Sequence, residues 1–192
     1  ANESGAPICR DDNDAVNELS ELADVILSNN RLIRVRADDT VTDFFDGKPY
    51  MIRRSRGYAP LPLMFTSCVS HKKEHISTAS DSAADNASVV SKPSVLGIGG
   101  ELKNSFCIGS GELFYPSPYI GDLSDIRTID ALRETINRFM TLLEVRPQAV
   151  ACDMHPLYQS RNLAYELCSK WGNKSHGHLV DIRSDKAIDN FC

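Results

Sequence analysis

The middle of the chain places the strongest constraint on its fold, because residues 68–93 contain many serines and almost no large apolar side chains. A segment of this composition cannot bury enough apolar surface to join a core. We therefore predict a serine-rich linker over residues 67–94, between a first structured unit, residues 1–66, and a second, residues 95–192. Hydrophobic residues make up 42% of the 192 residues, so a packed core is possible over most of the remaining length.

Charge and cysteine content exclude several functional classes. The net charge of −5 argues against binding along duplex nucleic acid, because no large basic face would be present to neutralise the phosphates. The six cysteines contain no C-x-x-C pair, which is a poor pattern for structural zinc, and we interpret them as reduced thiols. The sequence shows no apolar run of membrane length. We expect a cytoplasmic protein with no membrane partner.

The first unit is predicted to contain one helix and about three strands. Asp11 and Asp12 suit a helix N-cap, and apolar residues continue at helical spacing to Leu27, so the helix should end near residues 29–30. The alternation of residues 32–36 predicts a strand. The predicted hairpin has strands at residues 41–45 and 50–53, joined by the turn residues 46–49.

The second unit alternates strands and helices. Its predicted strands are residues 95–98, 106–108, 113–115 and 149–152, and its predicted helices are residues 129–143 and about 161–170. This order favours an α/β or α+β unit.

The most informative short motif is the group Arg53, Arg54 and Arg56, which leaves an apolar run and enters a turn at Gly57. A guanidinium is always charged, and its planar fork of donors fits phosphate or carboxylate oxygens. The motif therefore favours an anion pocket, such as one for a nucleotide phosphate. The alternative is a solvated basic hairpin whose arginines pair with nearby aspartates.

Two further patterns could take part in chemistry. The glycines within residues 97–100 would let the backbone approach a phosphate on which Lys103 places a charge. Their spacing matches neither the P-loop nor the dinucleotide fingerprint, and a tight hairpin with a solvated lysine is the alternative. Asp153 precedes His155 by two residues at the end of a buried strand, where the pair could share a metal. A structural histidine is the alternative there.

Several motifs, in order along the chain, resemble the HypF carbamoyltransferases of nickel–iron hydrogenase maturation. Those similar to the YrdC-like domain of that family are A-N-E-S-G-A-P-I at residues 1–8, N-R-L-I-R-V-R-A-D-D-T-V at residues 30–41 and R-R-S-R-G-Y-A-P at residues 53–60. Those similar to its Kae1-like domain are G-G-E-L-K-N-S-F at residues 99–106, S-P-Y-I-G-D-L at residues 117–123 and D-M-H-P-L-Y at residues 153–158.

The resemblance implies a fold and a division of the chain. Residues 1–66 would be the C-terminal part of an α+β YrdC-like domain. Residues 95–192 would be the N-terminal part of a Kae1-like domain, which has an actin/Hsp70-like nucleotide-binding fold. Both parts are expected to be incomplete, so that the chain is a fragment or a shortened copy.

The resemblance also implies a reaction. The YrdC-like domain would form carbamoyl-adenylate from carbamoyl phosphate and ATP, and the Kae1-like domain would transfer the carbamoyl group to the C-terminal cysteine of a HypE-like protein. The full-length family also holds a metal, zinc or iron, whose ligands are not found in this sequence. By motif matching, the residues expected at the adenylate or nucleotide are Asn2, Arg31, Arg36, Thr40, Arg53, Arg56, Lys103 and Asn104.

Two other functions stay open from the sequence. One is a non-catalytic remnant that binds nucleotide or protein, and the other is an enzyme similar to the tRNA threonylcarbamoyl-adenylate synthases. The order of YrdC-like and Kae1-like segments, together with the arginine motif, favours the hydrogenase-maturation family over the second. Departures from the family pattern, such as Asn29 and Tyr119 in place of histidines, leave the activity of the isolated chain open.

Overall fold

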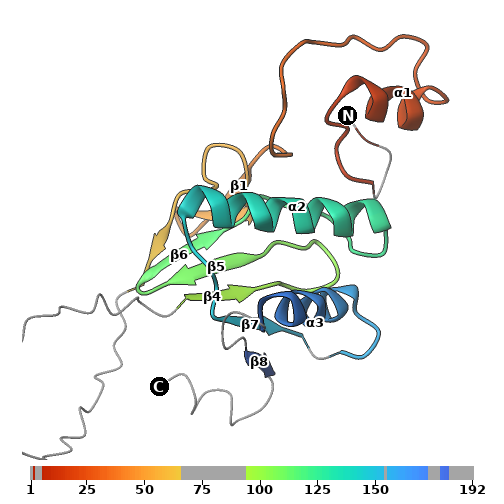
Figure 1. Cartoon of the computed structure of the whole chain (residues 1–192). Helices are drawn as coiled ribbons and strands as arrows, with labels where there is room; N and C mark the ends of the chain where they lie inside the picture. The colour runs from red at the N-terminus through yellow and green to blue at the C-terminus, as the bar shows by residue number, and fades with distance from the viewer. Residues whose placement is uncertain (1, 3–5, 66–93, 154, 173–177, 182–192) are drawn as a thin grey trace, which may run out of the picture.

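The computed structural model describes residues 2, 6–65, 94–153, 155–172 and 178–181, which form three helices and eight strands (Figure 1). The mixed α/β class predicted from the sequence is confirmed. The predicted linker lies outside the described residues, except for Ser94. The elements are α1 Asp12–Leu19, β1 Val41–Phe45, β2 Lys48–Arg53, β3 Leu63–Met64, β4 Ser94–Gly97, β5 Cys107–Ser110, β6 Leu113–Pro116, α2 Ile126–Leu143, β7 Ala149–Cys152, α3 Gln159–Gly172 and β8 His178–Asp181.

A six-stranded sheet of order β3-β6-β5-β4-β7-β8 organises the C-terminal region, residues 94–172 and 178–181. Strand β5 pairs antiparallel with both β4 and β6, whereas β7 pairs parallel with β4 and β8 pairs parallel with β7. The edge strand β3 comes from the N-terminal region, residues 6–65, and pairs Leu63 with Phe114 and Met64 with Leu113. The sequence had predicted neither β3 nor β8.

Helix α2 forms because its start signal and its apolar spacing agree. The side chain of Asp125 caps the helix by accepting from the backbone N–H of Arg127 at 2.8 Å. Ile129, Leu132 and Ile136 are then buried at intervals of three and four residues. The helix begins three residues before the predicted start and ends at Leu143, as predicted.

One hydrophobic core fills the space between the sheet and the helices α2 and α3. An ion pair of 2.9 Å between Arg133 and Glu166 joins the two helices on the outside. The apolar members of the core are Leu96, Ile98, Phe106, Ile108, Leu123, Ile129, Leu132, Ile136, Phe139, Val150, Cys152, Leu163, Ala164 and Leu167. No member of this core precedes residue 96 in the part of the chain that the structure describes.

The N-terminal region departs from the sequence prediction in two places. Helix α1 ends at Leu19 instead of continuing to residues 29–30, and residues 32–36 form no strand. Leu22, Val25 and Leu27 are exposed, so the predicted continuation has no surface on which to bury an apolar face. A short helix without such packing is marginal in water. The predicted hairpin is confirmed as β1 and β2.

Among the described residues, none of the helices combines the length and the apolar character that crossing a membrane would require.

Candidate functional site

An open cleft in the N-terminal region gathers four arginines, and we call it the arginine cleft. It has a volume of about 690 Å³ and is lined by Arg31, Arg34, Arg36 and Arg56. Apolar lining is provided by Ile8, Ile33, Val35 and Ala37, and none of the lining residues is acidic. The cleft therefore combines a concentration of positive charge with an apolar wall, and such a surface suits an anion that carries a flat apolar group.

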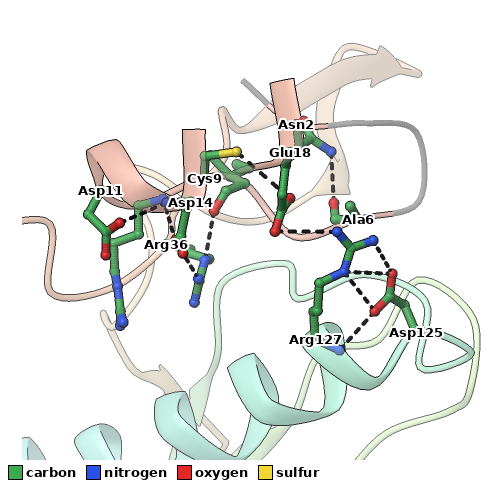
Figure 2. A network of polar contacts seen from close by, with 11 residues as sticks. Asn2, Ala6, Cys9, Asp11, Asp14, Glu18, Arg36, Asp125 and Arg127 are labelled. Carbon is green, nitrogen blue, oxygen red and sulfur yellow. Dashed lines mark hydrogen bonds and ion pairs between the residues drawn. The ribbon is translucent and has the colours of Figure 1, made fainter. Parts of the chain in front are cut away.

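The guanidinium of Arg36 is fixed by contacts with three segments. Its Nε donates to the carbonyl of Ile8 at 2.7 Å, and its Nη2 pairs with Asp14 of α1 at 3.3 Å (Figure 2). Its Nη1 lies 3.8 Å from a carboxylate oxygen of Glu134 on α2. Arg36 thus has a defined orientation before any ligand arrives.

Thr40 and Arg56 form a tight turn at the edge of the cleft. The hydroxyl of Thr40 donates to the carbonyl of Arg56 at 2.7 Å and accepts from the backbone N–H of Ser55 at 3.0 Å. The guanidinium of Arg56 donates to the carbonyl of Ala37 at 3.2 Å and pairs with Asp39 at 3.4 Å. In this arrangement the hydroxyl of Thr40 holds the backbone of the turn and is not among the lining groups of the cleft.

Arg53 lies outside the arginine cleft. Its Nε donates to the carbonyl of Asp39 at 2.7 Å, and its Nη1 pairs with Asp38 at 2.6 Å. The guanidinium carbon also lies 5.7 Å from the ring centre of Tyr119, which belongs to the C-terminal region. Arg53 and Lys103 line a second cavity between the two regions, of about 300 Å³, which we call the seam cavity.

Lys103 and Asn104 belong to the turn that follows β4. The backbone N–H of Lys103 donates to Asp122 at 2.6 Å, and Lys103 has a positive φ of 50°. The amide of Asn104 is 1% exposed and donates to the carbonyls of Ile98, at 3.0 Å, and Gly100, at 2.6 Å. Asn104 therefore stabilises the turn, while Lys103 presents its side chain at the seam.

Asn2 and Arg36 are brought together at a third, smaller cavity of about 170 Å³, which Tyr119 and Asp122 also line. The side-chain amide of Asn2 donates to the carbonyl of Ala6 at 2.8 Å. The predicted site residues are thus divided among three cavities, except for Thr40 and Asn104, which line none of the three. That the predicted residues contact an adenylate or nucleotide stays a prediction.

A chain of ion pairs, which the sequence analysis missed, joins the N-terminal region to α2. Arg127 contacts Glu18 of α1 at 3.3 Å and Asp125 at 2.6 Å (Figure 2). The hydrogen bonds from Arg127 hold the pKa of Asp125 below its ordinary value. Glu134 accepts two hydrogen bonds from Arg10, at 2.5 and 2.6 Å. Glu134 is the only acidic residue of α2 in these contacts, and its presence in the sequence does not identify its partners.

Asp153 and His155 lie at the end of β7, as predicted. A carboxylate oxygen of Asp153 accepts from the backbone N–H of His155 at 2.9 Å, and the His155 ring stacks on Tyr158 with centroids 4.3 Å apart. Within the described residues, no group of three or more His, Cys, Asp or Glu side chains could hold a metal ion.

Two family models match this chain, one before the predicted linker and one that begins near the end of the linker. The model of the HypF Kae1-like domain matches residues 90–183, and the model described as telomere recombination, of the Sua5, YciO and YrdC proteins, matches residues 1–55.

Curated relatives are similar to this chain over nearly its whole length. Carbamoyltransferase HypF of Rhizobium leguminosarum bv. viciae is 36% identical over 100% of this chain and 22% of its own length. Carbamoyltransferase HypF2 of Cupriavidus necator is 32% identical over 98% of this chain and 22% of its own length. The chain therefore spans about a fifth of the length of these relatives.

Solved structures agree with the sequence matches. A full-length HypF in its phosphate- and nucleotide-bound form is 37% identical, with a TM-score of 0.71 over 93% of this chain and 24% of that protein. The HypF of T. kodakarensis is 32% identical, with a TM-score of 0.73 over 94% of this chain and 20% of that protein. Together with the matched motifs, these similarities show that the chain belongs to the HypF carbamoyltransferase family.

Proposed function

We propose that this chain is the part of a hydrogenase-maturation carbamoyltransferase that holds the phosphate of a nucleotide or carbamoyl-adenylate in the arginine cleft. The observation that carries the proposal is the lining of the cleft, which has four arginines and no acidic residue. An adenylate combines a phosphate with a flat apolar base, and the cleft offers guanidinium groups beside apolar side chains. The nucleotide-bound form of a related HypF supports the same ligand class.

The proposed roles follow from how each arginine is held. Arg36 is oriented by α1 and α2, so it can meet a phosphate without further ordering, which lowers the entropic cost of binding. Arg31 and Arg34 have no ion pair among the described residues, so their charges are available to an incoming anion. Charge-assisted hydrogen bonds of this kind are about twice as strong as neutral ones.

The wider reaction belongs to the same proposal. In the whole protein, carbamoyl phosphate and ATP would supply the carbamoyl-adenylate, and the carbamoyl group would pass to the C-terminal cysteine of a HypE-like partner in the cytoplasm. Support comes from the family membership and from the presence of both YrdC-like and Kae1-like segments in this chain. A chain that binds nucleotide but transfers nothing would instead match the non-catalytic alternative.

Isothermal titration of the 192-residue chain with ATP and with adenosine tests the proposal. Arg31→Gln combined with Arg34→Gln removes two charges without breaking an ion pair described in the structure. We expect the double variant to bind ATP at least about 10-fold more weakly, because each charge-assisted hydrogen bond contributes about 1.5–3 kcal/mol. Adenosine has no phosphate, so its affinity should stay unchanged.

The matched control is Arg146→Gln, which neutralises an exposed arginine outside the cleft. It should leave the affinity for ATP unchanged. Equal affinity for ATP in the wild type and the double variant would rule out the arginine cleft as the phosphate site.

A further inference from the structure

Tyr119 lies where the N-terminal and C-terminal regions meet, outside the arginine cleft. It lines the small cavity of about 170 Å³ together with Asp38, and it lines the seam cavity of about 300 Å³ together with Arg53. Tyr119 is the one residue that the linings of these two cavities share. Its half-buried side chain therefore forms part of the wall between them.

The backbone on both sides of Tyr119 is fixed to the C-terminal region. The backbone N–H of Ser117 donates to the carbonyl of Phe106 at 2.8 Å, and the hydroxyl of Ser117 accepts from the backbone N–H of Phe106 at 2.9 Å. On the other side, the backbone N–H of Ile120 donates to the carbonyl of Asn104 at 2.9 Å. Ser117 and Asn104 are each 1% exposed, so water competes little for these bonds. The ring of Tyr119 is thus presented from a fixed backbone.

The guanidinium of Arg53 meets this ring from the N-terminal region. Its hydrogen bond to the carbonyl of Asp39, at 2.7 Å, and its ion pair with Asp38, at 2.6 Å, both come from the loop that precedes β1. Its central carbon lies over the Tyr119 ring, 5.7 Å from the centroid. A guanidinium within about 6 Å of an aromatic ring is attracted by the negative face of that ring. Arg53 is therefore held by oxygens of its own region and by an aromatic ring of the other region.

The surroundings of Tyr119 favour this contact. Burial raises the pKa of Tyr119 above its ordinary value, and the negative charge of Asp122 raises it further, while the positive charge of Arg53 acts in the opposite direction. Tyr119 is therefore neutral near pH 7, and Arg53 meets the ring of a phenol. Partial exclusion of water strengthens the attraction between a cation and a ring. A tyrosine also loses little conformational entropy when it is fixed, since its side chain has only two dihedral angles.

We propose that Tyr119 is a positioning residue for Arg53: its ring, presented by the C-terminal region, fixes the orientation of the guanidinium at the end of β2. If the two regions separate, Arg53 keeps its two oxygen partners but loses the ring. The orientation of Arg53 at the seam cavity therefore depends on the docking of the two regions. Because Arg53 is among the residues predicted to contact the adenylate, Tyr119 makes a competent site depend on docking. This role goes beyond phosphate binding in the arginine cleft and does not require it.

Nitrogen-15 NMR of the 192-residue chain without nucleotide tests the proposal at the side-chain Nε–H of Arg53, whose signal is assigned by its loss in Arg53→Lys. Tyr119→Leu keeps an apolar side chain but removes the aromatic face. We expect it to speed the hydrogen exchange of this Nε–H by about 2- to 5-fold, which corresponds to the loss of one cation–π contact at a partly exposed site. Tyr165→Leu is the matched control, because its ring lies 5.2 Å from Arg161 within α3, so the exchange at Arg53 should stay unchanged.

A pair of aromatic replacements covers the case in which Tyr119→Leu does not fold. Tyr119→Phe keeps the ring and should keep the wild-type exchange rate at Arg53. A trifluorinated phenylalanine at position 119 has nearly the same shape, but the fluorines withdraw electrons from the ring face, so exchange should be faster. The proposal would be overturned if the fluorinated ring left the exchange rate at its wild-type value, or if Tyr119→Phe raised it as much as Tyr119→Leu. Because no nucleotide is present, the outcome is separate from that of the ATP titration at the arginine cleft.

Discussion

The two regions of the molecule are stabilised in different ways. The C-terminal region has a continuous apolar core that includes Leu96, Ile136 and Val150, all 0% exposed. In the N-terminal region, α1 buries no residue, and the strands of the hairpin are mostly exposed, with Phe44 at 71%. The N-terminal region, where the arginine cleft lies, therefore depends on polar contacts and on its contacts with the C-terminal region rather than on a core of its own.

Docking connects the N-terminal region to the core at several points. Strand β3 extends the six-stranded sheet, and Phe65 packs edge-to-face against Phe114 with ring centroids 5.4 Å apart. Ion pairs from Arg10 and Arg36 converge on Glu134 of α2. The arrangement of the arginines therefore depends on residues that lie far away in the sequence.

Replacement of one large apolar side chain in each region should give the largest difference in stability between the two regions. Ile136→Ala removes a fully buried side chain from α2 and should lower the free energy of unfolding by about 2–5 kcal/mol, because the lost burial and the cavity both cost stability. Phe44→Ala, on the exposed hairpin, should change it by less than about 0.5 kcal/mol. Urea unfolding monitored by Trp171, which packs against the core, measures both.

Equal losses in the two variants would contradict this comparison, since they would mean that Phe44 is buried in solution. In that case the hairpin would be covered, and the N-terminal region would have apolar packing of its own.

Glycine replacement in the turn after β4 should have the next largest effect. Gly99 has a φ of 83°, and a Cβ at this position would lie 2.2 Å from the backbone oxygen of Ser105. We expect Gly99→Ala to cost about 1–3 kcal/mol, because both the dihedral angle and the contact are unfavourable. Gly100→Ala is the matched control, since no atom lies within 4 Å of its Cβ position. Thermal unfolding measures the stability of both variants. Equal melting temperatures for Gly99→Ala and Gly100→Ala would contradict the expected strain at Gly99.

The sequence predicted the fold best where side chains are buried. The apolar spacing predicted α2, and the short apolar run at residues 149–152 predicted β7. The apolar residues of both elements are largely buried, so local pattern and tertiary packing agree. The same reasoning failed after Leu19, because apolar residues at helical spacing stabilise a helix only if another surface buries them. Leu27, at 97% exposed, has no such surface.

The candidate site was predictable in residue type but not in arrangement. Of the arginines in the motif, Arg56 lines the arginine cleft, whereas Arg53 and Arg54 line the seam cavity, and that the motif binds an anion stays a prediction. It could not show that Arg53 stacks over Tyr119, because that contact joins residues on either side of the predicted linker. The short strand β3 was missed for a similar reason, since its partner β6 lies about fifty positions further along the chain.

Loss of the docking ion pairs should have a smaller and more local effect. Glu134→Gln removes the negative charge that pairs with Arg10 and Arg36, and these partly exposed ion pairs contribute about 1 kcal/mol or less. Limited proteolysis should then cut residues 20–37 faster, while the unfolding of the core changes little. Asp130→Asn breaks only the ion pair between Asp130 and Arg133, which both belong to α2, so it should leave the cleavage rate unchanged. Faster cleavage in Asp130→Asn alone would assign the effect to α2 and not to docking.

The smallest effect concerns the pH dependence of the C-terminal region. Hydrogen bonds from Arg133 and Lys170 hold the pKa of Glu166 below its ordinary value of 4.5. A lowered pKa in the folded state means that Glu166 stabilises the fold above the unfolded pKa, and that this contribution disappears as the pH falls through the folded pKa. Glu166→Gln should therefore lower the urea midpoint slightly at pH 7, and this difference should shrink as the pH falls below the ordinary pKa of 4.5. Glu112→Gln, at an exposed position with no described ion pair, is the control. If the urea midpoints of the wild type and Glu166→Gln still differed in acid, the Glu166 side chain would join α2 to α3 through packing, and its charge would add little.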